Sequence, residues 1–257
     1  MKIIDLSSDV VLVTGAAGSI GGAIARELAV AGARVIVADI HAEACADVAA
    51  EIRDAGGAAF PAAVDVRDTG SVDRGIRAGV GELGPLTGLV NVAAVLRTGR
   101  LDEMPEESWD EIMDINVGGT YRSTKAVLPF FRQSGRGSIV NLASVAAFGG
   151  SDDGSAYSAT KGAVLSFTYS TAGELAPEGF RVNAICPGWV DGGFTAQAMS
   201  ALEHPEALVE TARRMHYLGR MATPGDVANA AVWLLSDQAS FVTGTALFVD
   251  GGYMIKR

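Results

Sequence analysis

The sequence has few of the residues that build metal sites and disulfide frameworks. It contains two cysteines, Cys45 and Cys186, and three histidines, His41, His204 and His216. The cysteines lie far apart and no histidine pair has the H-E-x-x-H spacing of a zinc protease, so no metal site is expected. Because isolated thiols are typical of a reducing compartment, we expect a cytoplasmic location.

Other classes are disfavoured by what is missing. The net charge is −10 and no cluster of Lys and Arg offsets it, which argues against a nucleic-acid partner. No apolar run reaches the roughly 18 residues of a membrane span. The first ten residues include no long apolar region of the kind found in signal peptides. We therefore expect a protein with neither a membrane span nor a secretory signal.

What the chain does have is an alternation of short apolar runs with longer helical segments. Its 257 residues, 49% of them hydrophobic, suffice for one large domain, residues 1–257. The apolar runs predict strands at Val10–Val13, Arg34–Ala38, Ala59–Val64, Gly88–Val92, Ser138–Leu142, Arg181–Ile185 and Ala246–Val249. The intervening segments predict helices at Gly21–Ala31, Ala42–Ala55, Ser71–Glu82, Trp109–Arg132, Tyr157–Leu175 and Asp226–Leu235. The pattern predicts an α/β fold, a single-domain Rossmann-type doubly wound sheet of seven parallel strands flanked by helices.

One connection, Pro187–Leu218, is irregular and too long for an ordinary loop. Long connections with scattered apolar residues are usually binding loops, so residues 188–218 are expected to form a substrate lid. The alternative is a helical excursion that serves packing alone.

Tyr157 and Lys161 stand four residues apart, which places a phenol and an ammonium on one face of a helical turn. A free Tyr titrates near pH ~10, too high for a base at neutral pH. A nearby cation favours the phenolate, and a Tyr tuned in this way is a plausible general base for an alcohol proton. The spacing alone is also compatible with an ordinary surface pair.

A glycine-rich turn, Thr14–Gly21, joins the first strand to its helix. Small residues there let the backbone approach a pyrophosphate at the helix N-terminus. Asp39, at the end of the second strand, can accept hydrogen bonds from the adenosine ribose hydroxyls and would repel a 2′-phosphate. No Lys or Arg follows it within a turn, so the sequence favours NAD over NADP. The alternative is that Asp39 only caps the next helix.

Together these features resemble the short-chain dehydrogenase/reductase (SDR) family over essentially the whole chain. The matching pieces, in order, are Thr14–Gly21, Asp65-Val66, Asn91–Ala94, Asn116, Ser144, Tyr157 with Lys161, Pro187-Gly188 and Thr243–Gly252. The resemblance implies Tyr157 as the acid/base and Lys161 as the residue that lowers its pKa and binds the nicotinamide ribose. It also implies that Ser144 holds the substrate oxygen and that Asn116 anchors a water relay to Lys161.

The resemblance implies a set of cofactor contacts as well. Pyrophosphate contacts fall on Gly15, Ser19, Ile20 and Gly21, and adenine contacts on Asp65 and Val66. Contacts along the ribose and the fourth strand fall on Asn91 and Ala93, and those near the carboxamide on Pro187, Gly188 and Val190. Four positions depart from the family pattern: Ser19 replaces the middle glycine, Val92 and Ala94 replace an Asn and a Gly, and Gly192 replaces a Thr.

The substrate is less defined. Val95, Ala146 and Trp189 are expected to line an apolar pocket suited to a carbon-rich secondary alcohol or ketone. Asp152 would favour a polyol or a cation if it faces this pocket, or else it only sits favourably near a helix N-terminus. Arg97 and Arg100 could steer an anionic substrate, although solvated loop charge is the favoured explanation for them.

The leading hypothesis is an NAD-dependent oxidoreductase that interconverts a secondary alcohol and a ketone. The alternative within the family is a 3-oxoacyl thioester (acyl-carrier-protein) reductase, which Asp39 disfavours because such reductions usually use NADPH. A non-catalytic NAD(H)-binding sensor is a remote alternative, since Tyr157 and Lys161 are both present. The resemblance further implies a homotetramer that packs the two long helices across a twofold axis.

Overall fold

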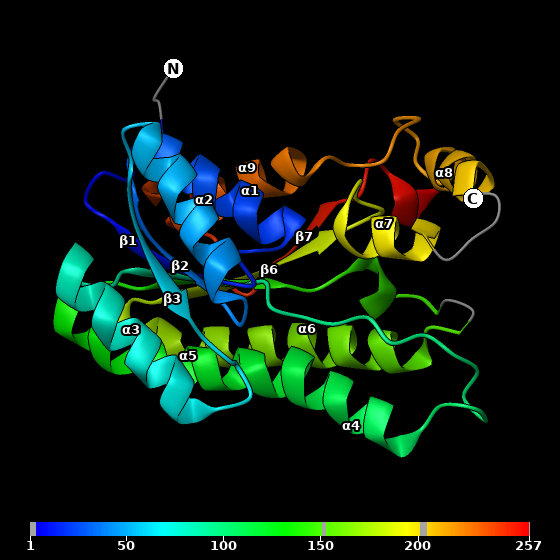
Figure 1. Cartoon of the computed structure of the whole chain (residues 1–257), viewed down its shortest axis with the longest axis horizontal. Helices are drawn as coiled ribbons and strands as arrows, with labels where there is room; N and C mark the ends of the chain where they lie inside the picture. Colours follow the sequence, from blue (N-terminus) through cyan, green and yellow to red (C-terminus); the bar gives the residue numbers. More distant parts are fainter. Residues whose placement is uncertain (1–3, 151–152, 201–204, 257) are drawn as a thin grey trace.

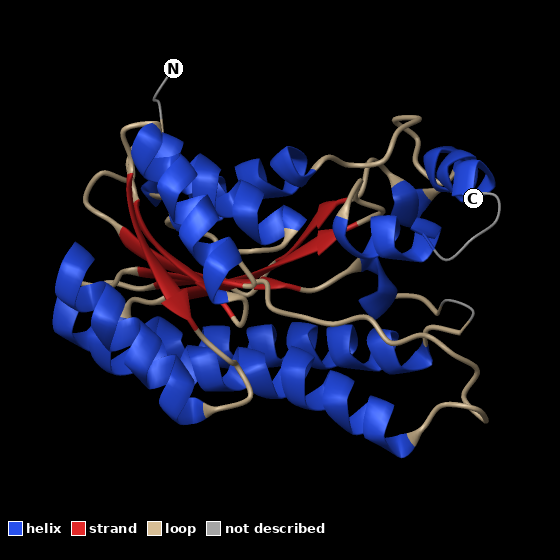
Figure 2. Cartoon of the chain, viewed as in Figure 1, coloured by secondary structure: helices blue, strands red, loops and turns tan. Residues whose placement is uncertain are grey.

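In a computed structural model, which describes residues 4–150, 153–200 and 205–256, the chain forms one seven-stranded sheet with helices on both faces (Figures 1 and 2). The strands are β1 (Val10–Thr14), β2 (Arg34–Asp39), β3 (Ala58–Ala63), β4 (Gly88–Asn91), β5 (Ser138–Leu142), β6 (Arg181–Pro187) and β7 (Ala246–Val249). Their order across the sheet is β3-β2-β1-β4-β5-β6-β7, and each neighbouring pair is parallel. The predicted fold class is confirmed, and every predicted strand is present with its ends shifted by at most two residues.

The strands are continuous apolar runs because both faces of the sheet are covered. All five residues of β1 are buried, and Val13 pairs with Val37 of β2 and Val90 of β4. Successive side chains of a strand point to opposite faces. Val13 accordingly belongs to one hydrophobic cluster, with Ile24, and Leu12 belongs to the other, with Phe131.

Each cluster is closed by its own layer of helices (Figure 1). One layer contains α1 (Ser19–Val30), α2 (Ala42–Asp54) and α9 (Pro224–Leu235). The other contains α3 (Thr69–Leu83), α5 (Gly119–Ser134) and α6 (Ser155–Leu175). Short 3₁₀ turns complete the chain at η2 (Val145–Ala147), η3 (Ala176–Glu178), η4 (Asp237–Ala239) and η5 (Tyr253–Ile255). Within the described residues, none of the helices is both long and apolar enough to cross a bilayer.

The long helix predicted at Trp109–Arg132 is not continuous. It begins earlier, as α4 (Glu106–Met113), passes through a π-helical turn η1 (Asp114–Gly118), and continues as α5. Two local contacts accompany this π-helical turn. The Asn116 side chain is drawn toward the backbone of Val95, and Gly119 lies so close to Val66 that a Cβ there would approach its Cγ2 to 2.7 Å. Such π turns recur at functional sites.

The connection predicted to be irregular contains two helices, α7 (Gly193–Ser200) and α8 (Pro205–Arg214), which lie beyond the carboxyl ends of β6 and β7 (Figure 1). Its middle, including Leu202, lies outside the described residues. The helical form follows from residues 205–214, whose apolar side chains Leu208 and Ala212 are four apart and share one helix face.

The start of α9 provides a test of local stability. Thr223 and Asp226 form a capping box, in which Asp226 Oδ2 accepts from Thr223 N at 2.7 Å and Thr223 Oγ1 accepts from Asp226 N at 3.2 Å. Arg220 also pairs with Asp226 at 2.7 Å. The Arg220 guanidinium and the Thr223 N–H hold the pKa of the Asp226 carboxyl far below its usual range.

We predict that Asp226→Asn lowers the free energy of unfolding at neutral pH by about 1 kcal/mol, the usual contribution of a helix cap. Because the folded carboxyl has the lower pKa, its stabilisation is present above the unfolded pKa and is lost as pH falls toward the folded value. The difference in the free energy of unfolding between wild type and variant should therefore become smaller below about pH 4. Urea unfolding of both proteins at neutral pH and below about pH 4 measures this difference. Asp237→Asn, whose side chain is 93% exposed, serves as the control. A gap that stays constant with pH would contradict the assignment.

Candidate active site

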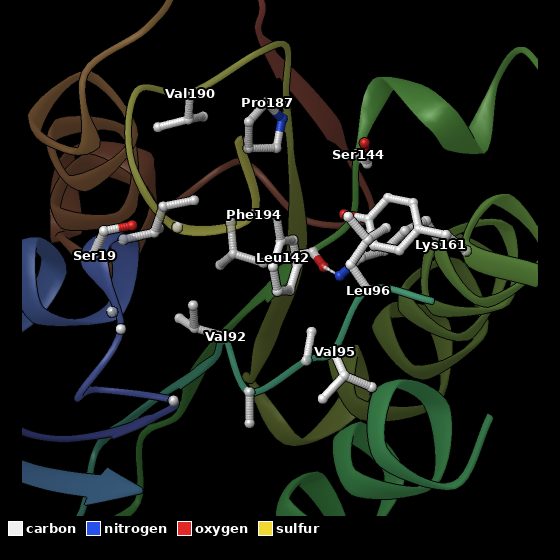
Figure 3. A pocket seen from close by; sticks show the side chains of 18 of the residues that line it. Ser19, Val92, Val95, Leu96, Leu142, Ser144, Lys161, Pro187, Val190 and Phe194 are labelled. Atoms are coloured by element: carbon white, nitrogen blue, oxygen red, sulfur yellow. Dashed lines mark hydrogen bonds between the residues drawn. The ribbon is translucent and has the colours of Figure 1, made fainter. Parts of the chain in front are cut away.

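The described residues line a cavity of about 1120 Å³ along the carboxyl edge of the sheet. The strand order reverses between β1 and β4, and in open α/β sheets ligands bind in the crevice at such a reversal. Figure 3 shows Ser19 and Val92 on one side of this cavity and Ser144 and Lys161 on the other. The loops after β1, β2, β3, β4, β5 and β6 all contribute to its wall.

The glycine-rich turn after β1 can accept only glycine at two positions. Gly15 has a φ of +69°, and a Cβ there would lie 2.6 Å from Ala93 N. A Cβ on Gly21 would collide with the carbonyl of Gly15. Gly18, at the N-cap of α1, has no side chain to cap the first turn, so the N–H groups of Ser19 and Ile20 face the cavity end of the helix. A pyrophosphate fits this arrangement, because a helix N-terminus attracts anions.

Asp39 ends β2 at the cavity wall, and both of its carboxylate oxygens are held. Oδ2 accepts from Ala17 N at 3.2 Å and Oδ1 from His41 N at 3.2 Å. The carboxylate therefore has a defined orientation beside the glycine turn. Asp39 stands two residues before His41, the N-cap of α2, and this helix has no side-chain cap, so the alternative that Asp39 only caps the helix is not supported.

Asp65 and Val66 follow β3 and line the cavity as expected, next to Arg67. Arg67 pairs with Asp65 through its side chain, with Nη2 at 2.7 Å from Oδ2, and this pair keeps the pKa of Asp65 below its usual value. The sequence argument considered cations after Asp39 and missed Arg67, which reaches the same cavity from the next strand. Because Asp65 engages it, Arg67 is not a free cation.

The fourth strand requires one correction. Ala93 and Val95 line the cavity, but Asn91 does not. Asn91 is buried within the sheet, where its Nδ2 donates to Asn141 Oδ1 at 2.9 Å and to Thr124 Oγ1 at 3.2 Å. Its side chain cannot reach a nucleotide while it makes these bonds. The Asn91 side chain therefore joins β4 to β5 instead of lining the cavity.

Ser144 and Tyr157 are brought together at the cavity wall by different elements. Ser144 begins the turn η2 after β5, where its Oγ accepts from Ala146 N at 3.1 Å, and Tyr157 lies in the first turn of α6. Burial raises the pKa of Tyr157 to about 12, and a hydrogen bond with Ser144 partly opposes this rise. The Tyr157 ring meets Phe194 of α7 edge to face, with centroids 6.1 Å apart.

Lys161 is buried one turn further along α6. Its Nζ donates to Leu142 O at 2.7 Å, the dashed contact in Figure 3, and lies 5.5 Å from the centre of the Tyr157 ring. Burial lowers the pKa of Lys161 to about 8. The expectation that Lys161 lowers the pKa of Tyr157 is not met in the protein alone, where burial of the phenol dominates.

The chain has a second pair with the same spacing, Tyr121 and Lys125 on α5. Both side chains are exposed, and Lys125 Nζ donates to Tyr121 Oη at 3.3 Å. The difference between the two pairs is burial at a cavity, which the spacing itself does not encode.

Asn116 lies behind the cavity wall rather than in it. Its Oδ1 accepts from Val95 N at 2.8 Å, and its Nδ2 donates to Val95 O at 3.0 Å and to Thr160 Oγ1 at 3.2 Å. One amide therefore fixes the loop after β4 and the turn of α6 between Tyr157 and Lys161. In this structure Asn116 positions the site, and its part in a water relay stays a prediction.

On the substrate side, Val95, Ala146 and Trp189 line the cavity, whereas Asp152 lies outside the described residues. Pro187, Gly188 and Val190 line it nearby. Arg97 pairs with Glu111 at 2.7 Å and Arg100 with Asp102 at 3.2 Å, so neither offers a free charge. Thr195 and Leu208 of the predicted lid line the cavity, and so do residues that the sequence argument missed: Thr98, Glu111, Tyr253 and Met254. Tyr253 and Met254 carried no signal, because they lie far along the chain in a short 3₁₀ turn.

The reversal of strand order and the glycine turn define a Rossmann-type protein. Similarity to known proteins identifies the family. The family model described as enoyl-(acyl carrier protein) reductase matches residues 15–254. The chain is 38% identical to 2-(S)-hydroxypropyl-CoM dehydrogenase 3 of Xanthobacter autotrophicus over 96% of this chain and 97% of that protein.

Two solved structures are also similar. Carveol dehydrogenase from Mycobacterium avium in complex with NAD has a TM-score of 0.93 and 30% identity, over 98% of this chain and 100% of that one. A variant of the actinorhodin polyketide ketoreductase with NADPH has a TM-score of 0.91 and 34% identity, over 97% and 99%. The chain belongs to the short-chain dehydrogenase/reductase family, and it is an oxidoreductase of the kind found there.

The buried Lys161 provides a second prediction. Its folded pKa, about 8, lies below the ordinary value, so between the two values the unfolded chain binds more protons and stability rises with pH. At neutral pH the folded state is therefore destabilised by the burial of the charged Lys161 ammonium. Lys161→Met should therefore raise the free energy of unfolding at pH ~7 by about 1–3 kcal/mol and abolish the rise between about pH 8 and 10. Urea unfolding across that range measures both effects.

Lys125→Met is the matched control, since it removes the exposed lysine of the surface pair. It should change stability by less than about 0.5 kcal/mol at any pH. A Lys161→Met variant that is less stable than wild type at neutral pH would show that the ammonium is a net stabiliser instead.

Proposed function

We propose that the protein is an NAD-dependent dehydrogenase that interconverts a secondary alcohol and a ketone. The observation that carries the proposal is the set of Ser144, Tyr157 and Lys161 on one wall of a cavity whose other wall is the uncapped glycine turn. A phenol, a hydroxyl and an ammonium at one place can bind an alcohol oxygen and move its proton. The glycine turn can hold the dinucleotide that accepts the hydride.

The residues present fit a dinucleotide along the edge of the sheet. Gly15, Ser19, Ile20 and Gly21 would hold the pyrophosphate, and Asp39 the adenosine ribose. The adenine end would meet Asp65 and Val66, Ala93 would lie along the fourth strand, and Pro187, Gly188 and Val190 would meet the carboxamide. When bound, the nicotinamide supplies the hydride chemistry. The protein's part is alignment and proton transfer.

During oxidation, the Tyr157 phenolate takes the hydroxyl proton of the alcohol, and during reduction the phenol returns it to the carbonyl oxygen. Ser144, which already hydrogen-bonds Tyr157, donates to the same substrate oxygen and stabilises charge there. Because burial raises the pKa of Tyr157 to about 12, the phenolate needs a cation. The Lys161 ammonium, 5.5 Å from the ring centre, is placed to favour it. Asn116 keeps the α6 turn that carries both groups in register.

The coenzyme proposal rests on Asp39. Its carboxylate is fixed by two backbone N–H groups at the cavity wall, where it suits ribose hydroxyls and opposes a 2′-phosphate. Arg67, the nearby cation that could offset it, is paired with Asp65. The similarity to a carveol dehydrogenase in complex with NAD supports the same choice.

The substrate proposed is an uncharged, carbon-rich secondary alcohol. The wall around Ser144 and Tyr157 is largely apolar, with Val95, Leu96, Val145, Ala146, Trp189, Phe194, Leu208 and Met254. The hydroxypropyl and carveol dehydrogenases among the similar proteins support an alcohol substrate. Residues 188–218 are proposed to act as a lid, since Phe194 and Leu208 of this segment already line the cavity.

The second candidate is a 3-oxoacyl thioester (acyl-carrier-protein) reductase. The family model is described as an acyl-carrier-protein reductase, and the ketoreductase structure with NADPH is similar. Asp39 argues against this candidate, because it disfavours NADPH. A non-catalytic NAD(H) sensor is disfavoured by the intact Ser144, Tyr157 and Lys161. A comparison of NADH and NADPH affinity separates the first two candidates.

We also propose a cytoplasmic homotetramer. The long helices expected to pack across a twofold axis expose large side chains, with Trp109 37%, Tyr121 48% and Tyr169 45% accessible. Aromatic residues of this kind are enriched at interfaces between subunits.

Replacing Tyr157 tests the proposed chemistry. Tyr157→Phe removes the proton donor and keeps the ring, so oxidation of secondary alcohols with NAD should fall by about 10²-fold or more while NADH binding is kept. Tyr121→Phe, the matched change in the surface pair, should leave activity unchanged. NADH absorbance across a panel of cyclic and acyclic secondary alcohols gives the rates. Activity that survives in Tyr157→Phe would remove this residue as the acid/base.

Replacing Asp39 tests the coenzyme. Asp39→Ala should weaken NAD and improve NADP, and shift the ratio of their kcat/KM values by about tenfold or more, since a full charge next to a phosphate is removed. Asp47→Ala, an exposed carboxylate on α2, is the control. Unchanged selectivity in Asp39→Ala would leave the NAD assignment without support.

A further inference from the structure

His216 follows α8 and is 1% exposed, beneath the loop after β6 that lines the cavity. Both ring nitrogens have partners. Nδ1 lies 2.6 Å from the carbonyl of Ala212, and the N–H of Trp189 donates to Nε2 at 3.2 Å. A carbonyl can only accept, so the proton is assigned to Nδ1 and Nε2 is left as the acceptor. The ring therefore links the end of α8 to the backbone of the cavity wall.

The packing around this ring is tight. A Cβ on Gly188 would lie 2.5 Å from His216 Nε2, so only glycine lets the loop approach the imidazole. On another side the ring meets Tyr253 of η5, with centroids 5.6 Å apart. Gly188, Trp189 and Tyr253 line the cavity, whereas His216 does not. The imidazole thus supports the wall from behind.

The loop of residues 188–191 is held by three backbone N–H groups. Gly188 N donates to Val249 O at 3.1 Å, Asp191 N donates to Ala222 O at 2.8 Å, and Trp189 N donates to His216 between them. Two of these acceptors are backbone carbonyls in the neighbouring segments. His216 supplies the acceptor that comes from a side chain, so its bond is the one that substitution can remove selectively.

We propose that His216 is a positioning residue for the coenzyme and the substrate: its Nε2 sets the path of residues 188–190, which form the nicotinamide side of the cavity. The inference rests on the proposed function for what that wall contacts. The buried imidazole of His216 thereby joins the end of α8, the C-terminal turn η5 and the nicotinamide wall. A shift of α8 is thereby passed to Trp189 and Val190.

Two conservative variants separate the two ring contacts. His216→Gln places an amide oxygen where Nε2 lies and keeps an acceptor for Trp189 N–H. His216→Asn places its amide where Nδ1 lies, keeps the contact with Ala212, and is too short for Trp189. We expect His216→Gln to bind NADH within about threefold of wild type and His216→Asn to bind it about tenfold more weakly, the effect of one lost buried hydrogen bond.

The readout is the equilibrium affinity for NADH, titrated by fluorescence, with the melting temperature of each variant beside it. Val227→Ala, a buried truncation in α9 that lies outside the cavity wall, is the matched control for lost stability. It should lower the melting temperature and leave NADH affinity unchanged. If His216→Asn does not fold, His216→Leu carries the same test, since it also lacks an acceptor.

If His216→Asn binds NADH as tightly as the wild type does, the inference is overturned. Equal weakening in the glutamine and asparagine variants would also overturn it, because it would show that the ring only fills space. These results differ from failure of the proposed function, in which the wild-type protein itself binds no NADH. With the inference correct, steady-state KM for NAD should follow the same order as the affinities.

Discussion

The parallel arrangement of the strands is the constraint on which the rest of this structure depends. Because all seven strands run the same way, their carboxyl ends share one edge, and every loop that leaves this edge can reach the same crevice. The strand order reverses at β1 and β4, and in open α/β sheets ligands bind in the crevice at such a reversal. At this point Gly15 lies close to Ala93, so the glycine turn packs against the loop that follows the fourth strand. Residues separated by more than a hundred positions, such as Ser19 and Tyr157, therefore line one cavity.

The same edge carries groups that a stable core would exclude. The Lys161 amine and the Tyr157 phenol are both displaced by burial toward their neutral forms. The fold offsets part of this cost through the Leu142 carbonyl and the Ser144 hydroxyl. Displaced pKa values of this kind cluster where a protein performs proton transfer. The exposed Tyr121 and Lys125 pair has the same spacing but lies outside the cavity, so the spacing alone does not determine whether the two groups are buried.

Much of the fold could be predicted from the sequence, because strands buried on both faces leave uninterrupted apolar runs. β5 and β7 match their predicted ranges, and the Ser144, Tyr157 and Lys161 group was located from spacing and family resemblance. Local patterns could not reveal what depends on tertiary contacts. The π turn at Asp114–Gly118 carries Asn116, whose side chain bonds to the loop after β4, a contact between segments far apart in the sequence. Asn91 was misplaced for a related reason: its amide is used between strands, which no local pattern records. Arg67 and Tyr253 reach the cavity from positions directly after the Asp65-Val66 and Thr243–Gly252 motifs, which do not themselves specify these side chains.

Two departures from the family pattern become one feature in three dimensions. Ser19 stands where a glycine is usual, and Gly192 where a threonine is usual. A Cβ on Gly192 would lie 3.4 Å from the Cβ of Ser19, and one on Gly193 would lie 2.8 Å from Ser19 Oγ. The Ser19 side chain at the start of α1 therefore lies beside Gly192 and Gly193, where the chain enters α7 without side chains of its own. Both glycines have positive φ values, +97° and +53°, so this segment also follows a path that other residues resist. At this edge of the cavity the hydroxyl is therefore carried by the start of α1 and not by residue 192 of the loop.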